Sequence, residues 1–354
     1  MDISIAAILA QDGVTSGAIY ALLALAFVLV FSVTRVIFIA QGEFVAYGAL
    51  TLAAIQANKM PQSAWMVAAL GVLTFLVEMG RTLSQPELRL NALRAGAIFA
   101  GKYLLFPLAV VAAAAVLAPM SLPQPVQVAL ALLIIIPMGP MIYRLAYEPL
   151  VEASTLVLLI VSVGVHFAMT GLGLVMFGAE GWRTDAFSDA RLDVPLGGSM
   201  LTISGQSLWV VVASALMIIA LYFYFDRTMS GKALRATAVN RLGARLVGIG
   251  TTEAGRLAFT LAALLGALCG ILIAPITTLN YGSGFLIGLK GFVAAIVGGL
   301  FSFPMAGLGA LLVGMLESYT SFWASAYKEV IVFALILPVL LWRSLAMGHV
   351  EEEE

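Results

Sequence analysis

Charged residues, cysteine and histidine are all scarce in this chain of 354 residues. Asp, Glu, Lys and Arg make up 10% of it, whereas soluble domains carry roughly 25%. So few charges cannot cover the two soluble domains that this length would otherwise suggest. The net charge of −1 supplies no basic patch for a nucleic acid. A single cysteine, Cys269, excludes an intrachain disulfide, and with only His166 and His349 beside it no Cys/His metal site is expected.

Apolar residues are abundant: they form 62% of the chain, and the mean hydropathy is +1.06. A helix needs about 20 mostly apolar residues to cross a bilayer, and continuous apolar runs indicate helices rather than the alternating strands of a barrel. We therefore expect an all-α polytopic membrane protein with about 11 transmembrane or re-entrant helices. The apolar runs are 14–33, 43–55, 60–77, two within 103–143, then 153–179, the second half of 194–225, 257–289, 291–316 and 330–342.

The distribution of lysine and arginine predicts the orientation. If the N-terminus lies outside and the C-terminus in the cytoplasm, most of the 18 basic residues fall in cytoplasmic loops, as the positive-inside rule requires. The external loops then hold only Lys59, Arg183, Arg191 and Lys328, and Lys290 falls inside a predicted membrane segment, between the runs 257–289 and 291–316.

Two longer polar segments interrupt the apolar runs. Residues 178–207 form the predicted external loop, which either receives a partner, gates a pore or merely connects two spans. Residues 226–256 form the predicted cytoplasmic loop, where Leu234, Ala238, Leu242, Leu246 and Ile249 recur at helical spacing and predict one apolar stripe. Glycines at 243, 248 and 250 indicate short helices with breaks. Such a helix suits docking into a groove of a soluble subunit, and the alternative is a plain basic connector.

Several motifs in this order resemble the branched-chain amino acid permeases of ABC importers, the LivH type. Gly17–Leu25 resembles the first helix of that family, Tyr143–Leu150 its cytoplasmic turn, and Gly288–Gly299 with Gly307 and Glu317 its C-terminal signature. The cytoplasmic loop resembles the coupling loop of such permeases, and the residues that carry this match are Gly231, Ala233, Arg235, Ala236, Ala244 and Gly248.

Two departures from the family pattern affect what the resemblance implies. The chain has Phe38 and Gln41 where the family usually has asparagine and histidine, although the following Gly42–Glu43 is kept. Residues 58–124 also contain an extra pair of apolar runs, which packs on the outside of the permease or contacts another subunit.

The resemblance implies one permease domain over 1–354, in a bacterial inner membrane, that is not an enzyme and binds no cofactor or metal itself. ATP and Mg²⁺ are expected on two partner ABC ATPase subunits. Further partners are a second permease chain, identical or LivM-like, and an external solute-binding protein. Branched-chain or hydrophobic amino acids are the first expected substrates, and urea, short amides or other carboxylates are alternatives. The candidate translocation pathway comprises Gln41, Glu43, Tyr47, Gly298 and Gly299.

The rival hypothesis is a transporter that is driven by an ion gradient and works without an ATPase. Such a transporter is expected to carry ionisable residues within its spans. Few are present, and each also has a structural interpretation. Glu43 could cap its helix, Lys290 could pair with Glu317, and His166 could be a hydrogen-bonded core residue. A further motif, Gly96–Lys102, fits the spacing of a phosphate-binding loop but lacks the Ser or Thr that should follow, because Tyr103 stands there.

Overall fold

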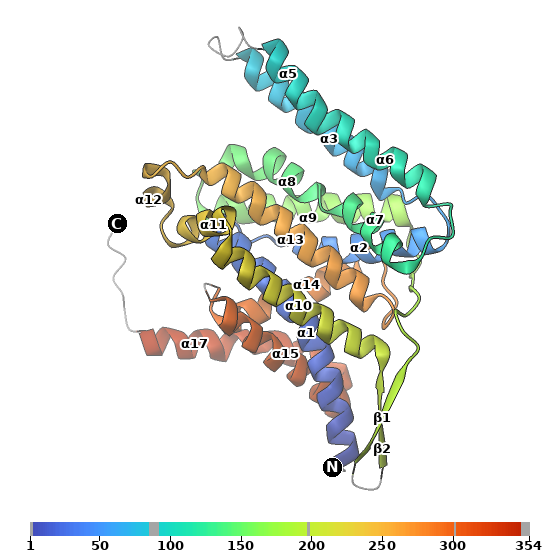
Figure 1. Ribbon diagram of the computed structural model, residues 1–354. Helices are drawn as coiled ribbons and strands as arrows, with labels where there is room; N and C mark the ends of the chain where they lie inside the picture. Colours follow the sequence, from blue (N-terminus) through green and yellow to red (C-terminus); the bar gives the residue numbers. More distant parts are fainter. Residues whose placement is uncertain (1–2, 85–91, 197–198, 301, 348–354) are drawn as a thin grey trace. The chain divides into compact units, whose positions relative to one another are not determined.

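The computed structural model describes residues 3–84, 92–196, 199–300 and 302–347 (Figure 1). The chain divides into two units, each assembled from separated segments. One unit comprises 1–28, 187–222 and 287–354, and the other comprises 29–186 and 223–286. Helices α1 (Ile3–Thr34), α10 (Gly205–Arg227) and α14 (Ser283–Gly298) run from one unit into the other.

Helices dominate both units. Apart from the three shared helices, the first unit contains α15 (Phe303–Trp323), the short η4 (Ser325–Tyr327), α16 (Lys328–Ala334) and α17 (Ile336–Met347). The second contains α2 (Gln41–Gln56), α3 (Ser63–Ser84), α5 (Ala92–Ala100), η1 (Gly101–Leu105), α6 (Phe106–Leu117), α7 (Gln124–Ile135), α8 (Met138–Ile142), η2 (Tyr143–Tyr147), η3 (Glu148–Leu150), α9 (Thr155–Phe177), α11 (Met229–Val239), α12 (Arg241–Leu246) and α13 (Thr251–Ile273).

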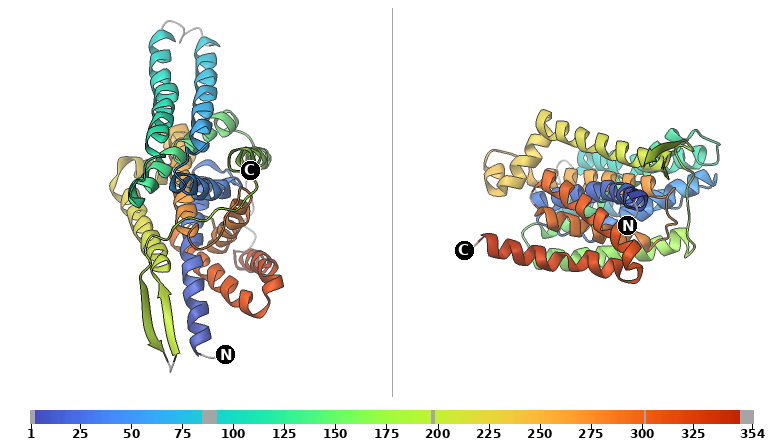
Figure 2. Two further views of the ribbon diagram at one scale, coloured as in Figure 1. Left: turned by 90° about the vertical axis from the view of Figure 1, so that its right-hand side faces the viewer. Right: turned by 90° about the horizontal axis from the view of Figure 1, so that it is seen from below.

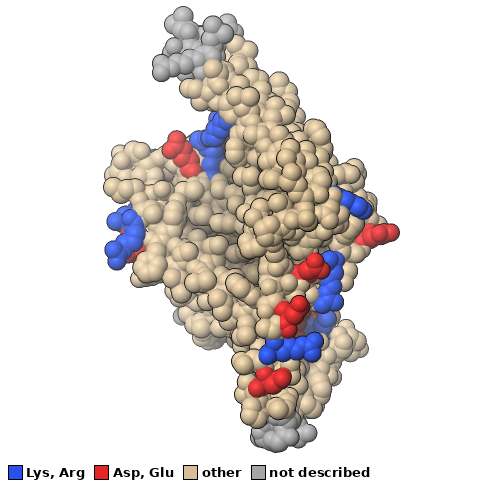
Figure 3. Space-filling view, turned by 45° about the vertical axis from the view of Figure 1, so that its right-hand side comes forward, with Lys and Arg blue, Asp and Glu red and all other residues tan. Residues whose placement is uncertain are grey.

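Within the described residues, eight helical segments are long and apolar enough to cross a membrane, and α14 is a shorter apolar helix. The predicted all-α polytopic architecture is therefore confirmed, while the number of about 11 helices stays a prediction. Figure 3 shows how little charge the surface carries: on the face drawn, charged side chains form a few groups between broad uncharged areas.

Helix α2 lies at the centre of the second unit. Every residue of this helix except Ala54 and Gln56 is buried. Its backbone packs closely on α13 because glycines leave room on both helices. A Cβ at Gly48 would lie 2.5 Å from the carbonyl oxygen of Ala267, and one at Gly266 would lie 2.7 Å from the Cβ of Phe44. This close approach fixes α2 and the polar side chains that it carries.

The extra pair of apolar runs forms a helical hairpin, with α3 beside the continuous rod of α5, η1 and α6 (Figures 1 and 2). The rod contains a π-helical turn, in which the N–H of Phe106 bonds to the carbonyl of Gly101. Pro107 explains the distortion, because its ring has no N–H and clashes with the carbonyl four residues earlier. The phosphate-loop-like residues 96–102 are thus helical. Of the predicted cytoplasmic residues, Arg89 lies outside the described residues, as does the side chain of Arg94.

The predicted external loop contains a β-hairpin that the sequence reasoning did not anticipate. Strands β1 (Arg191–Leu196) and β2 (Ser199–Ser204) pair antiparallel, with Arg191 opposite Ser204. The alternation of Leu192 and Val194 with Arg191 and Asp193 is a strand signal. The pair Gly197–Gly198, which follows Leu196 in the sequence, is common in hairpins. Both signals are present in the sequence, but they cover a short segment beside the long apolar runs that dominate it.

Candidate functional site

A carboxylate–imidazole pair, with the carboxylate buried and the imidazole half-buried, joins α2 to α9. Glu43, in the first turn of α2, is fully buried, and its Oε1 lies 2.9 Å from His166 Nδ1 on α9. Thr170, one turn beyond His166, donates its hydroxyl to the His166 carbonyl at 2.9 Å. The second carboxylate oxygen, Oε2, is buried and has no hydrogen-bond partner among the described residues. A buried carboxylate oxygen left unpaired is costly, so this position is a candidate for function.

Aromatic and backbone groups enclose the pair. The ring of Phe285 lies 4.7 Å from the His166 ring, centroid to centroid. Nearby, Gly284 approaches the backbone of Gly42 so closely that a Cβ at Gly284 would touch Gly42. The segment that begins α14 thereby closes one side of the pair, and it depends on a glycine to do so.

The other two predicted pathway residues of α2 are buried as well. Tyr47, one turn beyond Glu43, donates its hydroxyl to the Met169 carbonyl on α9 at 2.6 Å. Gln41 donates its Nε2 to the Ala262 carbonyl on α13 at 2.9 Å, while its Oε1 is buried without a partner among the described residues. The structure therefore brings Gln41, Glu43 and Tyr47 together on one buried helix. Whether they line a pathway stays a prediction.

The remaining predicted pathway residues, Gly298 and Gly299, fall in the other unit. Helix α14 ends at Gly298, Gly299 has a φ of +94°, and α15 begins at Phe303. The glycine pair therefore stands at a break between two helices. A Cβ at Gly298 would meet the backbone of Ala306, so this glycine is required by a close approach of the two helices.

A second ionisable cluster lies within the first unit. Lys290 on α14 places its Nζ 2.5 Å from Glu317 Oε1 on α15, and the Tyr20 hydroxyl of α1 donates to Glu317 Oε2. Glu329 lies 3.9 Å from the same Lys290 nitrogen. The predicted pairing of Lys290 with Glu317 is confirmed. No group of three metal-ligating side chains occurs in the part of the chain that the structure describes.

The predicted cytoplasmic loop folds as two short helices separated at Asn240. Asn240 has a φ of −149°, and its side chain caps α12 by accepting from the Gly243 N–H at 2.8 Å. The prediction of short helices with breaks is confirmed, but the single apolar stripe is wrong. Leu234 is buried, whereas Leu242 is 69% exposed and Leu246 is 80% exposed. Asn240 ends one helix and caps the next, so residues before and after it do not lie on one continuous helical face.

The six predicted coupling residues divide into supporting and accessible positions. Gly231 and Ala244 are buried, and a Cβ at Gly231 would meet the backbone of Tyr224 and Phe225. Ala233 and Ala236 are half-buried, and Arg235 is exposed 3.8 Å from Asp226. Gly248 has a φ of +84°, which favours glycine. These residues shape the loop rather than form its exposed apolar surface.

Two exposed apolar side chains of this loop, Val239 and Val247, do not belong to the stripe predicted from the sequence. Val239 is 85% exposed and Val247 is 76% exposed, beside Leu242 and Leu246. We name these four residues the loop patch. Arg245 approaches Glu152 at 3.7 Å and Arg241 donates to the Val151 carbonyl at 3.4 Å, which anchors α12 to the turn before α9. The loop patch is therefore presented on an anchored helix pair.

Comparison with known proteins settles the family. The family described as "Branched-chain amino acid transport system / permease component" matches residues 9–340. The chain belongs to this family. The permease is 31% identical over 222 residues to the high-affinity branched-chain amino acid transport system permease protein BraD of Pseudomonas aeruginosa, a match that covers 61% of this chain and 72% of BraD. It is 29% identical over 208 residues to LivH of Escherichia coli K12, covering 57% and 67% of the two chains.

Similarity extends to an archaeal protein, the probable LivH of Methanocaldococcus jannaschii, at 29% identity over 215 residues, covering 57% of this chain and 67% of that protein. No solved structure matches. The predicted resemblance is thus confirmed: the permease is a multi-pass membrane component of ABC-type amino acid transport, and the family comprises transport subunits rather than enzymes.

Sequence reasoning did not find the contact between Glu43 and His166. These residues are 123 positions apart, on helices whose order in space no local pattern reveals. The interaction of Arg144 with Glu78 and Glu148, which ties the extra hairpin to the predicted cytoplasmic turn, was not expected either. The only sequence feature that could have indicated this interaction is the opposite charge of Glu78 and Arg144, each of which directly follows a predicted apolar run.

Proposed function

We propose that the permease is the membrane-spanning subunit of an ATP-driven importer of branched-chain or other hydrophobic amino acids in a bacterial inner membrane. Two ABC ATPase subunits, which carry ATP and Mg²⁺, bind its cytoplasmic loop. A second permease chain, identical or LivM-like, completes the pathway, and an external solute-binding protein delivers the substrate. The N-terminus lies outside and the C-terminus in the cytoplasm. The names of BraD and LivH support the substrate class.

The loop patch is the observation that carries this proposal. Val239, Leu242, Leu246 and Val247 expose large apolar side chains on two short helices that Arg241 and Arg245 anchor. Apolar anchors on a short rigid helix suit insertion into a groove of a soluble partner. Because α13 follows directly after Gly250, a partner that moves the loop patch also pulls on the helix that packs against α2.

The pathway proposal centres on Glu43. Its buried Oε2 lacks a partner among the described residues, and a zwitterionic amino acid carries an ammonium group that donates to carboxylates. Gln41 and Tyr47 lie beside it on α2, and α14 ends at Gly298–Gly299, a helix break of the kind that occurs along transport routes. Urea or a short amide would offer N–H donors to the same oxygen and remains the alternative substrate class.

Nucleotide-sensitive crosslinking tests the coupling. Cys269, which is buried, is replaced by alanine, and single cysteines are placed at Val239 or Leu246 in the permease co-purified with its genomically adjacent ATPase. Crosslinks that change when ATP is added support the proposal. A cysteine at Lys59, on the predicted external side, is the control and should react only with a reagent applied from outside. Absence of any loop crosslink contradicts the proposal.

The Glu43–His166 pair gives the ion-driven transporter one specific observation in its favour, because buried ionisable pairs occur in proton-coupled transporters. The permease is therefore reconstituted alone in vesicles with a proton or sodium gradient. Uptake without an ATPase would establish the rival hypothesis. Uptake only with the ATPase, ATP and a binding protein supports the importer.

A further inference from the structure

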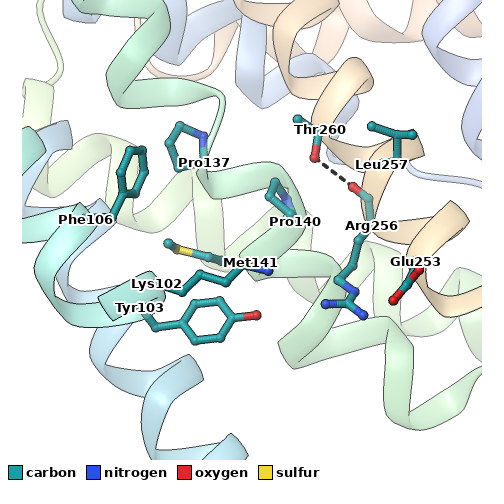
Figure 4. Close-up of a pocket in the computed structure, with 10 residues that line it drawn as sticks. All are labelled: Lys102, Tyr103, Phe106, Pro137, Pro140, Met141, Glu253, Arg256, Leu257 and Thr260. Atoms are coloured by element: carbon teal, nitrogen blue, oxygen red, sulfur yellow. Dashed lines mark hydrogen bonds between the residues drawn. The ribbon is translucent and has the colours of Figure 1, made fainter. Parts of the chain in front are cut away.

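A pocket of about 700 Å³ lies between the extra hairpin and the helices α8 and α13 (Figure 4). Its volume is within the range of about 300–1,000 Å³ found for small-molecule sites. Two cationic side chains enter it from opposite sides, Lys102 from η1 and Arg256 from α13. The Tyr103 hydroxyl points toward the Arg256 guanidinium in Figure 4. The pocket is separate from the Glu43 cluster and from the loop patch.

The polar groups of the pocket are suited to an anion. Arg256 Nε is buried and has no hydrogen-bond partner among the described residues, although a guanidinium presents donors suited to phosphate. Lys102 Nζ lies 5.3 Å from the centre of the Tyr103 ring. Glu253 is the single carboxylate of the lining, so the pocket keeps one net positive charge. A phosphodiester, with its single negative charge, balances that charge.

Apart from Thr260, whose hydroxyl donates to the Arg256 carbonyl at 2.8 Å, the rest of the lining is apolar and comes from Phe106, Pro137, Pro140, Met141 and Leu257. Outside the pocket, the hairpin exposes Ile98, Leu105 and Leu108 by 61%, 66% and 53%. These side chains belong to a segment apolar enough to span the membrane, so lipid chains are the natural neighbours of this surface. A ligand with both an anionic head and an apolar tail matches the two halves of the pocket.

The π-helical turn supports a binding role. It spans Gly101–Leu105 and therefore includes both Lys102 and Tyr103. Single π-turns within α-helices occur frequently at functional sites. From these observations we infer that the pocket binds an anionic phospholipid, with its phosphodiester between Lys102 and Arg256 and an acyl chain along Phe106 and Leu257. The bound lipid joins the extra hairpin to α13, the helix that follows the cytoplasmic loop. This inference does not depend on the transported substrate.

Photo-crosslinking with full-length permease tests the site. Phosphatidylglycerol bearing a diazirine in its acyl chain is added at low fraction to phosphatidylcholine nanodiscs, and labelled peptides are mapped. Label on residues 102–106 or 256–260 supports the inference, and label spread evenly over the exposed hairpin contradicts it. Because this measurement uses the unaltered chain, it does not depend on the folding of a variant.

Variants then identify the groups responsible. Lys102→Gln with Arg256→Gln should weaken phosphatidylglycerol binding by about tenfold or more, as expected for the loss of two basic contacts near a membrane surface. Leu257→Trp, which fills the pocket and keeps both cations, should also abolish site-specific labelling. The matched control, Arg227→Gln with Lys232→Gln, removes two cations outside the pocket. It should leave both phosphatidylglycerol binding and site-specific labelling unchanged. Equal binding by the pocket and control variants would overturn the inference.

Competition separates a lipid from a soluble anion. Inorganic phosphate at millimolar concentration should leave phosphatidylglycerol labelling unchanged, because it lacks the apolar tail. If phosphate displaces the lipid at that concentration, and protects the permease from thermal unfolding as well as the lipid does, the pocket is a soluble-anion site and the lipid inference is wrong.

Discussion

Two clusters of ionisable side chains lie within the apolar helices of this permease, and they differ in how completely their groups are paired. Around Glu317, each carboxylate oxygen has a partner, Lys290 on one and Tyr20 on the other. Around Glu43, one oxygen meets His166 and the other is buried without a partner among the described residues. A fully paired buried charge is a structural element. In the proposed pathway, the unpaired oxygen is the position that accepts a hydrogen bond from a bound substrate.

The largest expected effect is a loss of stability when the fully paired cluster around Glu317 is broken. Among the residues that the structure describes, Glu317→Ala leaves Lys290 with Glu329 as its remaining carboxylate, 3.9 Å away and 42% exposed. Removing one partner of a buried ion pair costs about 3–5 kcal/mol, so most of the permease should unfold or aggregate in detergent. Thermal unfolding followed by size-exclusion chromatography measures the loss. The double variant Lys290→Met with Glu317→Gln should recover most of the stability, since Gln still accepts from Tyr20. A single variant as stable as the parent would show that Lys290 does not depend on Glu317.

The second expected effect separates the two clusters by function. Glu43→Gln keeps the size of the side chain but removes the charge that an ammonium donor requires. Charge-assisted hydrogen bonds contribute about 1.5–3 kcal/mol, so ATP-driven uptake should fall by roughly tenfold or more. The melting temperature should change little, because Gln retains an acceptor for His166.

Glu317→Gln is the matched control, with the same chemical change in the complete cluster. Its melting temperature should fall while uptake per folded permease is retained. Both quantities come from the same preparations of permease, reconstituted with ATPase and binding protein. If both variants lose stability and neither loses uptake, the distinction between the clusters is wrong and Glu43 is structural too.

The contrast between the clusters also explains what the sequence could predict. Lys290 and Glu317 lie 27 positions apart in consecutive apolar segments, and two buried opposite charges on neighbouring helices are expected to meet. Glu43 and His166 come from segments whose packing depends on the whole unit. Apolar runs predict that spans exist because hydrophobic burial is a local property of the sequence, but they carry no information on which spans touch.

Other differences between expectation and structure have local physical causes. The apolar stripe predicted from Leu234 to Ile249 was wrong because Asn240 caps a new helix and resets the phase. The β-hairpin at 191–204 was not expected because a short alternating segment is weak beside long apolar runs. The break at Gly298–Gly299 also has a local cause, since a glycine pair followed by Pro304 disfavours a continuous helix.

The smallest expected effect comes from moving Glu43 by displacing helix α2, without changing the Glu43 side chain itself. Gly48→Ala adds a methyl group that would lie 2.5 Å from the carbonyl oxygen of Ala267, which forces α2 away from α13. Overpacking of this kind costs about 1–3 kcal/mol, and the shift moves Glu43, which lies on the same helix. Gly171→Ala is the control: the same methyl group on α9 meets open space, so stability should change by no more than about 1 kcal/mol and uptake should be retained. Thermal unfolding and uptake are measured for both variants. If Gly48→Ala lowers stability but leaves uptake per folded permease intact, α2 tolerates displacement and the fixed position of Glu43 is not required for transport.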